Sequence, residues 1–375
     1  MSERVSGGHG GSRVELSLPA QLERMARTRA ARDGRPTLKD THVTRSHGSG
    51  GKATHALIDS LILPAFANPL LDGCADAAVF SAGPGGARIA FTTDSYVVSP
   101  LFFPGGDIGK LAVHGTINDL AASGAQPLAL SVALILEEGL EMDTLRRVID
   151  SMAEAAAAAG VHVVTGDTKV VDRGKADGIF VNTSGVGLVR GGLDLDARRV
   201  AVGDVVIVSG QVGDHGMAVM LARDALELEA EIVSDSAPLH GLVAALLGAA
   251  PGTRVLKDPT RGGVATSLNE IATRAGVSIT VDEERVPVRT EVRGACEILG
   301  IDPLHIANEG KMLAVVPPGE VDAALTAMRA HPLGARATVI GRVDAEPRGM
   351  VIVKTAVGGA RVLDMLVGDP LPRIC

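Results

Sequence analysis

Short apolar runs alternate with helix-like segments along most of this chain, and the alternation occurs twice. In the first series, the runs are typical of strands by their length and β-branched content, and the segments between them have helical periodicity. The predicted strands cover residues 77–81, 88–92, 128–136, 162–165 and 179–188, and the predicted helices cover 53–63, 107–123 and 143–159. Such a mixture of strands and helices predicts layered packing around a sheet.

A second series begins near Val200, after the polar stretch 194–199. Its predicted strands are 200–210, 312–316 and 337–343, and its predicted helices are 216–222, 239–247 and 262–275. At about 150 residues per domain, the 375 residues fit two domains or three. We place the boundary here, with an N-terminal domain over 38–195 and a C-terminal α+β domain over 196–366.

The two ends of the chain have a different character. Residues 1–37 are rich in Gly, Ser and Arg around one short helical stretch at 21–32, and we expect a mobile extension. Residues 367–375 contain two prolines, which disfavour helix, so we expect a mobile, extended tail that could reach roughly 30 Å. Cys375 at its tip could be carried as a reactive group, although a chance terminal cysteine is the alternative.

Composition excludes several classes of partner. Acidic side chains outnumber basic ones by 44 to 36, and aromatic residues make up 2% of the chain, which argues against nucleic-acid binding. The cysteines Cys74, Cys296 and Cys375 form no C-x-x-C pair, as suits a reducing compartment. Neither a signal peptide nor an apolar run of about 20 residues is present. The sequence thus predicts a cytoplasmic chain with no membrane partner.

Four aspartates recur at comparable places in the first series. Asp76 opens a predicted strand, Asp94 and Asp167 follow two others, and Asp119 lies on the helix 107–123 beside Asn118. Carboxylates at strand ends can converge on one crevice, where Mg²⁺ bound by them and by substrate phosphates would relieve their repulsion. The alternative is that each aspartate is an ordinary turn residue.

Two glycine-rich loops are candidate anion sites. Gly48-Ser-Gly-Gly-Lys52 could surround phosphates with backbone N–H groups, but it lacks the P-loop pattern and could equally be a flexible linker. Asp258-Pro-Thr-Arg-Gly-Gly263 precedes a predicted helix, whose N-terminus could bind an anion. A plain turn and helix cap would look similar.

These stretches together resemble the HypE family of hydrogenase maturation proteins. The family belongs to the superfamily of aminoimidazole ribonucleotide synthetase, selenophosphate synthetase and thiamine-monophosphate kinase. The resemblance spans residues 41–375, and the ending Pro372-Arg-Ile-Cys375 is its most specific part. The other matching stretches are 47–52, 76–80, 92–96, 103–110, 115–119, 166–169, 258–263 and 308–311.

The resemblance implies an α+β fold of two PurM-like domains and a homodimer formed through the first-domain sheet, with ATP bound near the interface. It also implies a reaction. The carbamoyltransferase HypF loads a carbamoyl group onto Cys375, ATP-dependent dehydration converts it to a thiocyanate, and the cyanide passes to iron on the HypC–HypD complex.

The resemblance further assigns roles to residues. Mg²⁺ would be bound by Asp76, Asp94, Asp119 and Asp167, and ATP by these four together with Gly50, Gly51, Lys52 and Asn118. Cys375 would carry the substrate, and Glu309 and Lys169 are the candidates for proton removal. Because a lysine acts as a base only when its pKa is lowered, we expect Glu309 to be the acceptor and Lys169 to relay or orient.

Other functions were weighed against this one. Selenophosphate synthetases carry Cys or selenocysteine in the glycine-rich loop, whereas this chain has His47 and Ser49 there. A non-catalytic ATP-binding scaffold stays open, as does another ATP-dependent enzyme acting on a small molecule in solution.

Overall fold

The computed structural model describes residues 40–71, 75–223, 231–368, 371 and 373–375. The N-terminal extension expected over 1–37, with its helical stretch at 21–32, lies outside the described residues, as does Cys74. None of the helices in the described ranges combines the length and apolar character that crossing a membrane requires.

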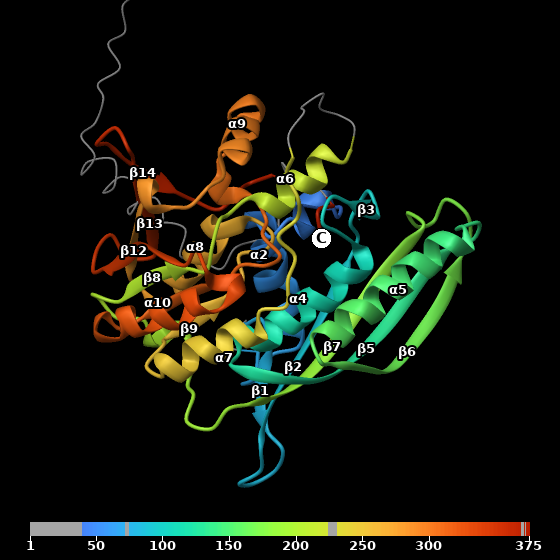
Figure 1. Ribbon diagram of the computed structural model, residues 1–375, viewed down its shortest axis with the longest axis horizontal. Coiled ribbons are helices and arrows are strands. Elements are labelled where there is room, and N and C mark those ends of the chain that lie inside the picture. The colour runs from blue at the N-terminus through green and yellow to red at the C-terminus, as the bar shows by residue number, and fades with distance from the viewer. Residues whose placement is uncertain (1–39, 72–74, 224–230, 369–370, 372) are drawn as a thin grey trace, which may run out of the picture. The chain divides into compact units, whose positions relative to one another are not determined.

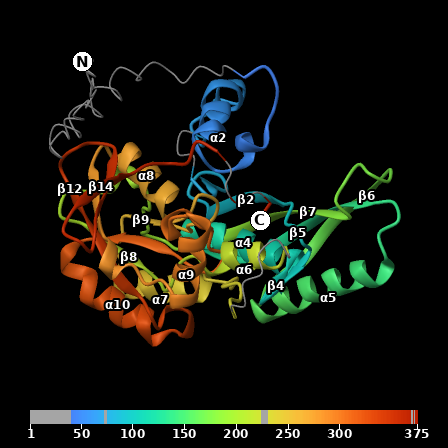
Figure 2. The ribbon, with the colours of Figure 1, turned by 90° about the horizontal axis from the view of Figure 1, so that it is seen from above.

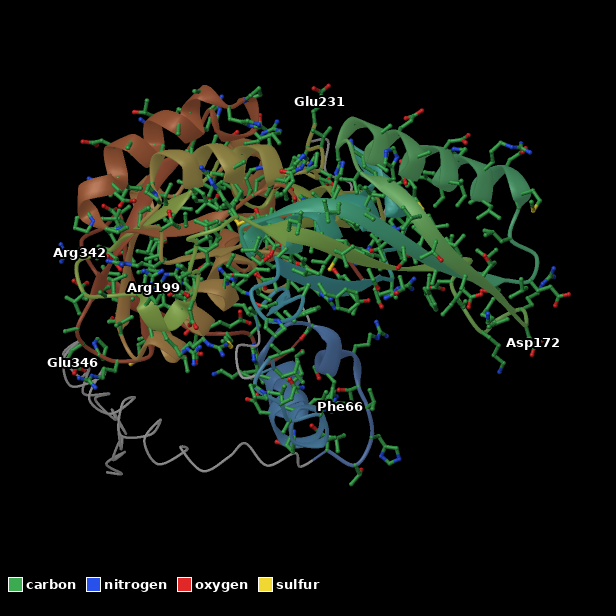
Figure 3. All side chains as sticks on the ribbon, turned by 90° about the horizontal axis from the view of Figure 1, so that it is seen from below. Phe66, Asp172, Arg199, Glu231, Arg342 and Glu346 are labelled. Carbon is green, nitrogen blue, oxygen red and sulfur yellow. The ribbon has the colours of Figure 1, made fainter. Side chains whose placement is uncertain are left out.

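The first described segment is helical and follows the glycine-rich loop. A 3₁₀ turn, η1 (Arg45–Gly48), leads into α2 (Lys52–Leu57), the π-helical turn η2 (Ile58–Ile62) and α3 (Leu63–Ala65). The helix expected over 53–63 is therefore present and two residues longer at its C-terminal end. Phe66, which is 66% exposed, lies at the outer end of this segment (Figure 3).

The first sheet has five strands in the order β1-β2-β7-β5-β6 (Figure 1). Only β5 and β6 pair in parallel, and the other pairs are antiparallel. The strands are β1 (Ala78–Ser81), β2 (Arg88–Tyr96), β5 (Ala125–Glu137), β6 (His162–Val171) and β7 (Ile179–Val189).

Two strands run further than the sequence predicts. Asp94 lies inside β2, where it is paired with Thr183, and Asp167 lies inside β6, where it is paired with Ala133. The expectation that these aspartates end their strands is wrong. Gly-Asp-Thr is a turn-forming sequence in isolation, but the hydrogen bonds of a neighbouring strand outweigh that local preference.

Helices α4 (Ile108–Ala122) and α5 (Met142–Ala158) cover one face of this sheet (Figure 1). Asp107 caps α4, because its Oδ1 accepts hydrogen bonds from the N–H groups of Gly109 and Lys110 at 2.7 and 3.1 Å. The opposite face leaves Phe91, Leu188 and Ile135 between 40% and 45% exposed. A short hairpin, β3 (Phe102–Phe103) and β4 (Gly106–Asp107), precedes α4.

The second sheet has seven strands in the order β14-β13-β10-β12-β8-β11-β9. Helix α8 (Gly263–Ala275) packs on one face with Val206 and Val208, while α7 (His240–Ala249) and α10 (Val321–Ala330) pack on the other with Ile207. The alternation along β8 (Val205–Val208) thus supplies both cores. The other elements are β9 (Val255–Lys257), β10 (Ser278–Asp282), β11 (Leu313–Val316), β12 (Thr338–Asp344), β13 (Met350–Lys354), β14 (Ala360–Leu363), α6 (Asp214–Leu221), α9 (Thr290–Leu299) and the 3₁₀ turns η3 (Ala197–Arg199), η4 (Glu283–Arg285), η5 (Pro303–His305), η6 (Pro318–Glu320) and η7 (Pro332–Gly334).

The end of the chain is docked, in contrast to the mobile tail that the sequence predicts. Leu371, Ile374 and Cys375 are each 6% exposed or less and belong to the same apolar core as α4 and α6. Figures 1 and 2 place the C-terminus beside these two helices. Burial of a leucine or isoleucine side chain stabilises by about 1.5–3 kcal/mol, which favours the docked position.

Candidate functional site

Four carboxyl groups gather where the two sheets meet α4. Asp76 precedes β1, Asp94 lies in β2, Asp119 lies near the end of α4 and Asp258 directly follows β9. Electrostatic coupling links Asp119 to the other three. The structure therefore brings together three of the four aspartates that the sequence singled out and adds Asp258.

Burial and mutual repulsion raise the pKa of several of these groups. Burial raises the pKa of Asp119 well above its usual range, and Asp258, Asp76 and Asp94 raise it further. Burial and then Asp76 raise the pKa of Asp258 to about 7. The Thr92 hydroxyl oxygen lies 2.9 Å from Asp119 Oδ2 and 2.8 Å from the Asp76 carbonyl oxygen. The Thr92 hydroxyl, as a donor to Asp119, lowers the Asp119 pKa in part, against the larger effect of burial.

Asp167 does not join this cluster within one chain. In β6, Asp167 is paired with Ala133 of β5. Ala133 is paired with Asn182 of β7, and Asn182 is paired with Ser95 of β2. Residues paired in this way point to the same face, while neighbouring residues in a strand alternate. Asp167 therefore shares the open face with Ser95, whereas Asp94 points to the other face, and three strand spacings of about 4.8 Å separate β6 from β2.

Lys169 lies on the same open face as Asp167. Its Nζ forms an ion pair with Asp167 Oδ2 at 2.5 Å, and both side chains are more than 60% exposed. Figure 3 shows Asp172, which directly follows β6, at the far end of the strands from the glycine-rich loop segment. The expected convergence of Asp167 and Lys169 with the other site residues is thus not met in a single chain.

A buried ammonium group stands inside the carboxylate cluster. Lys257 Nζ lies 2.5 Å from Asp76 Oδ1 and 3.0 Å from Glu270 Oε2, and His55 Nε2 lies 3.1 Å from Glu270 Oε1. Burial would raise the pKa of Glu270, but Lys257 and His55 lower it to about 2. This chain of charges connects α2 through α8 to Asp76, and sequence reasoning missed it because its members are far apart in the sequence.

The glycine-rich loop lies beside the loop that contains Asp258. Arg261 donates from Nη1 to the Gly48 carbonyl at 2.8 Å, and its Nη2 lies 3.9 Å from Asp94 Oδ1. Gly50 has φ = +73°, and its N–H donates to the Thr54 hydroxyl at 3.0 Å. Gly51 caps α2. The two candidate anion loops thus form one structure, joined by an arginine.

Lys52 is engaged on the far side of this loop. Its Nζ lies 2.5 Å from Asp364 Oδ2, and its backbone N–H donates to the Leu366 carbonyl at 2.9 Å.

A cavity of about 220 Å³ opens between the two loops and the tail. Its lining includes Ser49, Arg261 and Cys375.

Glu309 is buried at the same place, and its main chain is held by two neighbours. Its N–H donates to Asp235 Oδ1 at 3.1 Å, and its carbonyl accepts from Asn118 Nδ2, also at 3.1 Å. Burial raises the pKa of the Glu309 carboxyl well above its usual range, and Asp258, Asp94 and Asp235 add to this. Lys311 is paired with Asp235 at 2.9 Å.

The Asn118 side chain is engaged with main-chain groups of the protein. Both of its amide N–H groups donate to carbonyls, of Ala237 and Glu309, and its Oδ1 accepts from Leu239 N at 2.8 Å. A nucleotide could receive a hydrogen bond from this amide only if one of these bonds were lost. In this structure Asn118 supports the main chain of Glu309, and its contact with ATP stays a prediction.

Cys375 completes the site. The Val97 N–H, just after β2, donates to the Cys375 main-chain oxygen at 3.3 Å. Cys375 is also the largest cause that raises the pKa of Arg261; burial lowers this pKa, and Asp94 and Glu309 raise it further. The chain terminus, the cluster and Glu309 therefore share one arginine.

Two observations bear on whether this site fits ATP and Mg²⁺. The Tyr96 hydroxyl is buried among Asp94, Asp119 and Glu309 and has no hydrogen-bond partner in the described part of the chain. No group of three His, Cys, Asp or Glu side chains in that part is already arranged around a metal position. Mg²⁺ commonly takes only one or two protein carboxylates with water and substrate phosphates, so the cluster fits the ion when it is bound with a nucleotide.

We expect the stability of the metal-free protein to fall as pH rises from about 4 to 7. With a folded-state pKa of about 7 against 3.8 in the unfolded chain, Asp258 keeps a proton on folding that the unfolded chain has lost. At about 1.4 kcal/mol per pKa unit, this group alone removes roughly 4 kcal/mol once the pH exceeds 7. Thermal unfolding in a chelating buffer measures the effect.

Asp258→Asn should make this pH dependence less steep, because the amide has no proton to lose, while the other buried carboxyl groups keep their share of it. Mg²⁺ should raise the melting temperature more at pH 8 than at pH 5.5. A melting temperature that rises with pH over this window would contradict the clustered, protonated carboxyl groups.

The sheets and the site together define a class of protein. Residues 74–189 match the model of "AIR synthase related protein, N-terminal domain", and residues 201–354 match that of the C-terminal domain. The chain is an α+β, two-domain member of this AIR synthase-related class.

Closer relatives place the chain within that class. It is 54% identical over 338 residues to the carbamoyl dehydratase HypE of Rhodobacter capsulatus, covering 90% of this chain and 99% of the relative. The structure of HypE in complex with ATP matches with a TM-score of 0.74 and 47% identity, covering 89% of this chain and all of that one. The HypE–HypF complex matches with a TM-score of 0.78 and 47% identity, covering 83% of this chain and all of the matched chain. This chain belongs to the carbamoyl dehydratase HypE family.

Proposed function

We propose that the protein dehydrates an S-carbamoyl group on Cys375 to a thiocyanate at the expense of ATP. The observation that carries this proposal is the buried position of Cys375, which shares Arg261 with the acidic cluster and with Glu309. The names of the relatives, one solved with ATP and one with HypF, support it. In this role HypF donates the carbamoyl group, and the cyanide passes to iron on HypC–HypD in hydrogenase maturation, within the cytoplasm.

The chemistry requires a leaving group and a base. The carbamoyl oxygen attacks the γ-phosphorus of ATP, and ADP leaves. The C–O bond of the resulting phosphate ester then breaks, so phosphate carries the oxygen away while the nitrogen gives up two protons and forms the C≡N bond. Phosphoryl transfer depends mainly on positioning and on neutralised charge, and proton removal depends on a base within hydrogen-bond reach.

Each part of the site has a task in this reaction. One or two of the carboxylates Asp76, Asp94, Asp119 and Asp258 would hold Mg²⁺ together with the phosphates, and the ion would supply the neutralising charge. The backbone N–H groups at Gly50 and Gly51 and the Lys52 ammonium contact the phosphates once the Gly50 N–H leaves the Thr54 hydroxyl and Lys52 leaves Asp364. Glu309 accepts a proton from the nitrogen, because its carboxyl ionises once the carboxylates around it are neutralised.

The remaining residues act across a homodimer. The open face of the first sheet exposes Phe91, Leu188 and Ile135 on adjacent strands, and the ten-residue strand β6 is its unpaired edge. An apolar face and an unpaired edge of this kind favour association. A second copy on this face brings Asp167 and Lys169 to the partner's nucleotide, so that Lys169 relays a proton or orients the substrate.

The mass of the intact protein tests this function. The purified chain is mixed with the carbamoyltransferase and carbamoyl phosphate, before and after addition of Mg-ATP, beside a Cys375→Ala control. We expect a carbamoyl adduct that then loses the mass of one water, and no adduct on the control. No adduct on Cys375 under any condition would overturn the proposal and favour an ATP-dependent enzyme with a diffusible substrate.

A further inference from the structure

The tail is held at the site through its own main chain. The Ser99 N–H donates to the Arg373 carbonyl at 3.1 Å, and the Val97 N–H donates to the Cys375 main-chain oxygen at 3.3 Å. These two hydrogen bonds join the tail to residues 97–99, which follow β2. They leave the Ile374 carbonyl on the other side of the tail.

Helix α6 supplies the donors on that other side. His215 Nε2 lies 2.7 Å from the Ile374 carbonyl, and Arg223, just after the helix, donates from Nη2 to the Arg373 carbonyl, also at 2.7 Å. Arg223 Nε also donates to the Ser99 carbonyl at 2.8 Å, so this arginine bridges the tail and the segment after β2. Thus two side chains eight positions apart bind successive carbonyls.

The protonation state of His215 follows from its partners. A carbonyl can only accept, so Nε2 carries the hydrogen, and Nδ1 accepts from the Ser234 hydroxyl at 2.8 Å. His215 is fully buried, and burial lowers its pKa, which keeps the ring neutral with one donor and one acceptor. The imidazole is therefore a fixed donor aimed at the peptide bond that precedes Cys375.

We infer that His215, Arg223 and the Val97–Ser99 segment form a binding site for the main chain of residues 373–375. The four hydrogen bonds that these residues make to the tail all end on its main-chain oxygens. These oxygens are the same whether the sulfur carries hydrogen, carbamoyl or cyano. This inference rests on the proposed function and deepens it, since one site then holds substrate and product forms of the tail in one position. His215 and Arg223 are positioning residues in this arrangement.

Side chains of the tail add further contacts that do not depend on what the sulfur carries. Ile374 is buried in the core that contains Met217 of α6, and Arg373 forms an ion pair with Asp177. These contacts also remain unchanged when the sulfur is modified. The carbamoyltransferase must therefore compete with the whole main-chain site to reach Cys375.

The rate at which iodoacetamide labels Cys375, located by peptide mass mapping of the full chain, reports how often the tail leaves. His215→Leu and Arg223→Met each leave a tail carbonyl without its donor, so we expect each to raise this rate about tenfold. His215→Gln keeps an N–H near the Nε2 position and should label like the wild type. His114→Leu removes another buried imidazole, one that contacts Ser236 rather than the tail, and should not raise the rate.

A second measurement separates this inference from the proposed function. With the tail already carbamoylated, His215→Leu and Arg223→Met should convert the adduct at most a few-fold more slowly, because a tenfold rise in a small undocked fraction leaves most tails docked, while carbamoyl loading is not slowed. Equal labelling rates in the wild type, His215→Leu and Arg223→Met would overturn the main-chain site, whatever the reaction. If the wild type never gains an adduct, the proposed function fails, and the labelling comparison still decides whether the site exists.

Discussion

Replacement of Glu309 by glutamine should leave Cys375 able to accept a carbamoyl group but stop its dehydration. The amide has the shape of the carboxyl but cannot accept the proton that the nitrogen must lose. Loss of a general base slows a reaction by about 10²–10⁴-fold. Intact mass spectrometry should therefore show the carbamoyl adduct accumulating and persisting after addition of Mg-ATP.

The same substitution should not destabilise the metal-free protein. Burial and three nearby carboxyl groups raise the pKa of Glu309, so its charged form opposes folding, and this cost grows as the pH rises. The neutral amide removes that cost, and the melting temperature at pH 8 should stay the same or rise. Activity and stability thus change in opposite directions, which damage to the fold would not produce.

Glu270→Gln is the matched control, because the pKa of the Glu270 carboxyl is lowered in the folded protein, whereas that of Glu309 is raised. The Glu270 pKa of about 2 against 4.5 in the unfolded chain gives a stabilisation present above pH 4.5 and lost as the pH falls towards 2. At neutral pH the amide should cost roughly 3 kcal/mol in the free energy of unfolding. A Glu309→Gln variant that dehydrates its adduct at the wild-type rate would assign proton removal to another group.

Local sequence signals located much of this site, because several of its carboxylates lie beside regular elements. Asp76 precedes a strand and Asp119 lies on a buried helix, and these positions follow from apolar periodicity along the chain. Asp258 carries the same signal, an aspartate directly after a short apolar strand, and it could have been added to the set on that ground.

Other features depend on contacts that no local pattern contains. Whether Asp167 faces the cluster is decided by the register of β6 against β5, and a shift of one residue would reverse it. The use of Asn118 depends on carbonyls more than 100 positions away. The docking of the tail depends on the apolar core that accepts Leu371 and Ile374, whose members lie far away in the sequence.

The position of Lys169 leads to a complementation experiment between two inactive chains. Lys169→Ala keeps Cys375 but has lost the lysine, while Cys375→Ala keeps the lysine but cannot carry substrate. If Lys169 acts on the partner's site, a mixed dimer has one complete site, formed by Cys375 of the first chain and Lys169 of the second. Mixed dimers isolated through two different tags should therefore regain about half of the wild-type dehydration per dimer.

The reciprocal pairing distinguishes action across the dimer from action within one chain. A wild-type chain is paired with a chain that carries both Lys169→Ala and Cys375→Ala, so its only Cys375 and only Lys169 lie on the same polypeptide. Action across the dimer leaves this pair without a complete site, and it should be inactive, whereas action within the chain would leave it about half active. Activity in the second pair and none in the first would contradict the placement of Lys169 at the partner's site, and a monomer in size-exclusion chromatography would contradict the dimer itself. Both pairs contain the same two substitutions in the same amounts, so a difference between them reports only which polypeptide supplies the lysine.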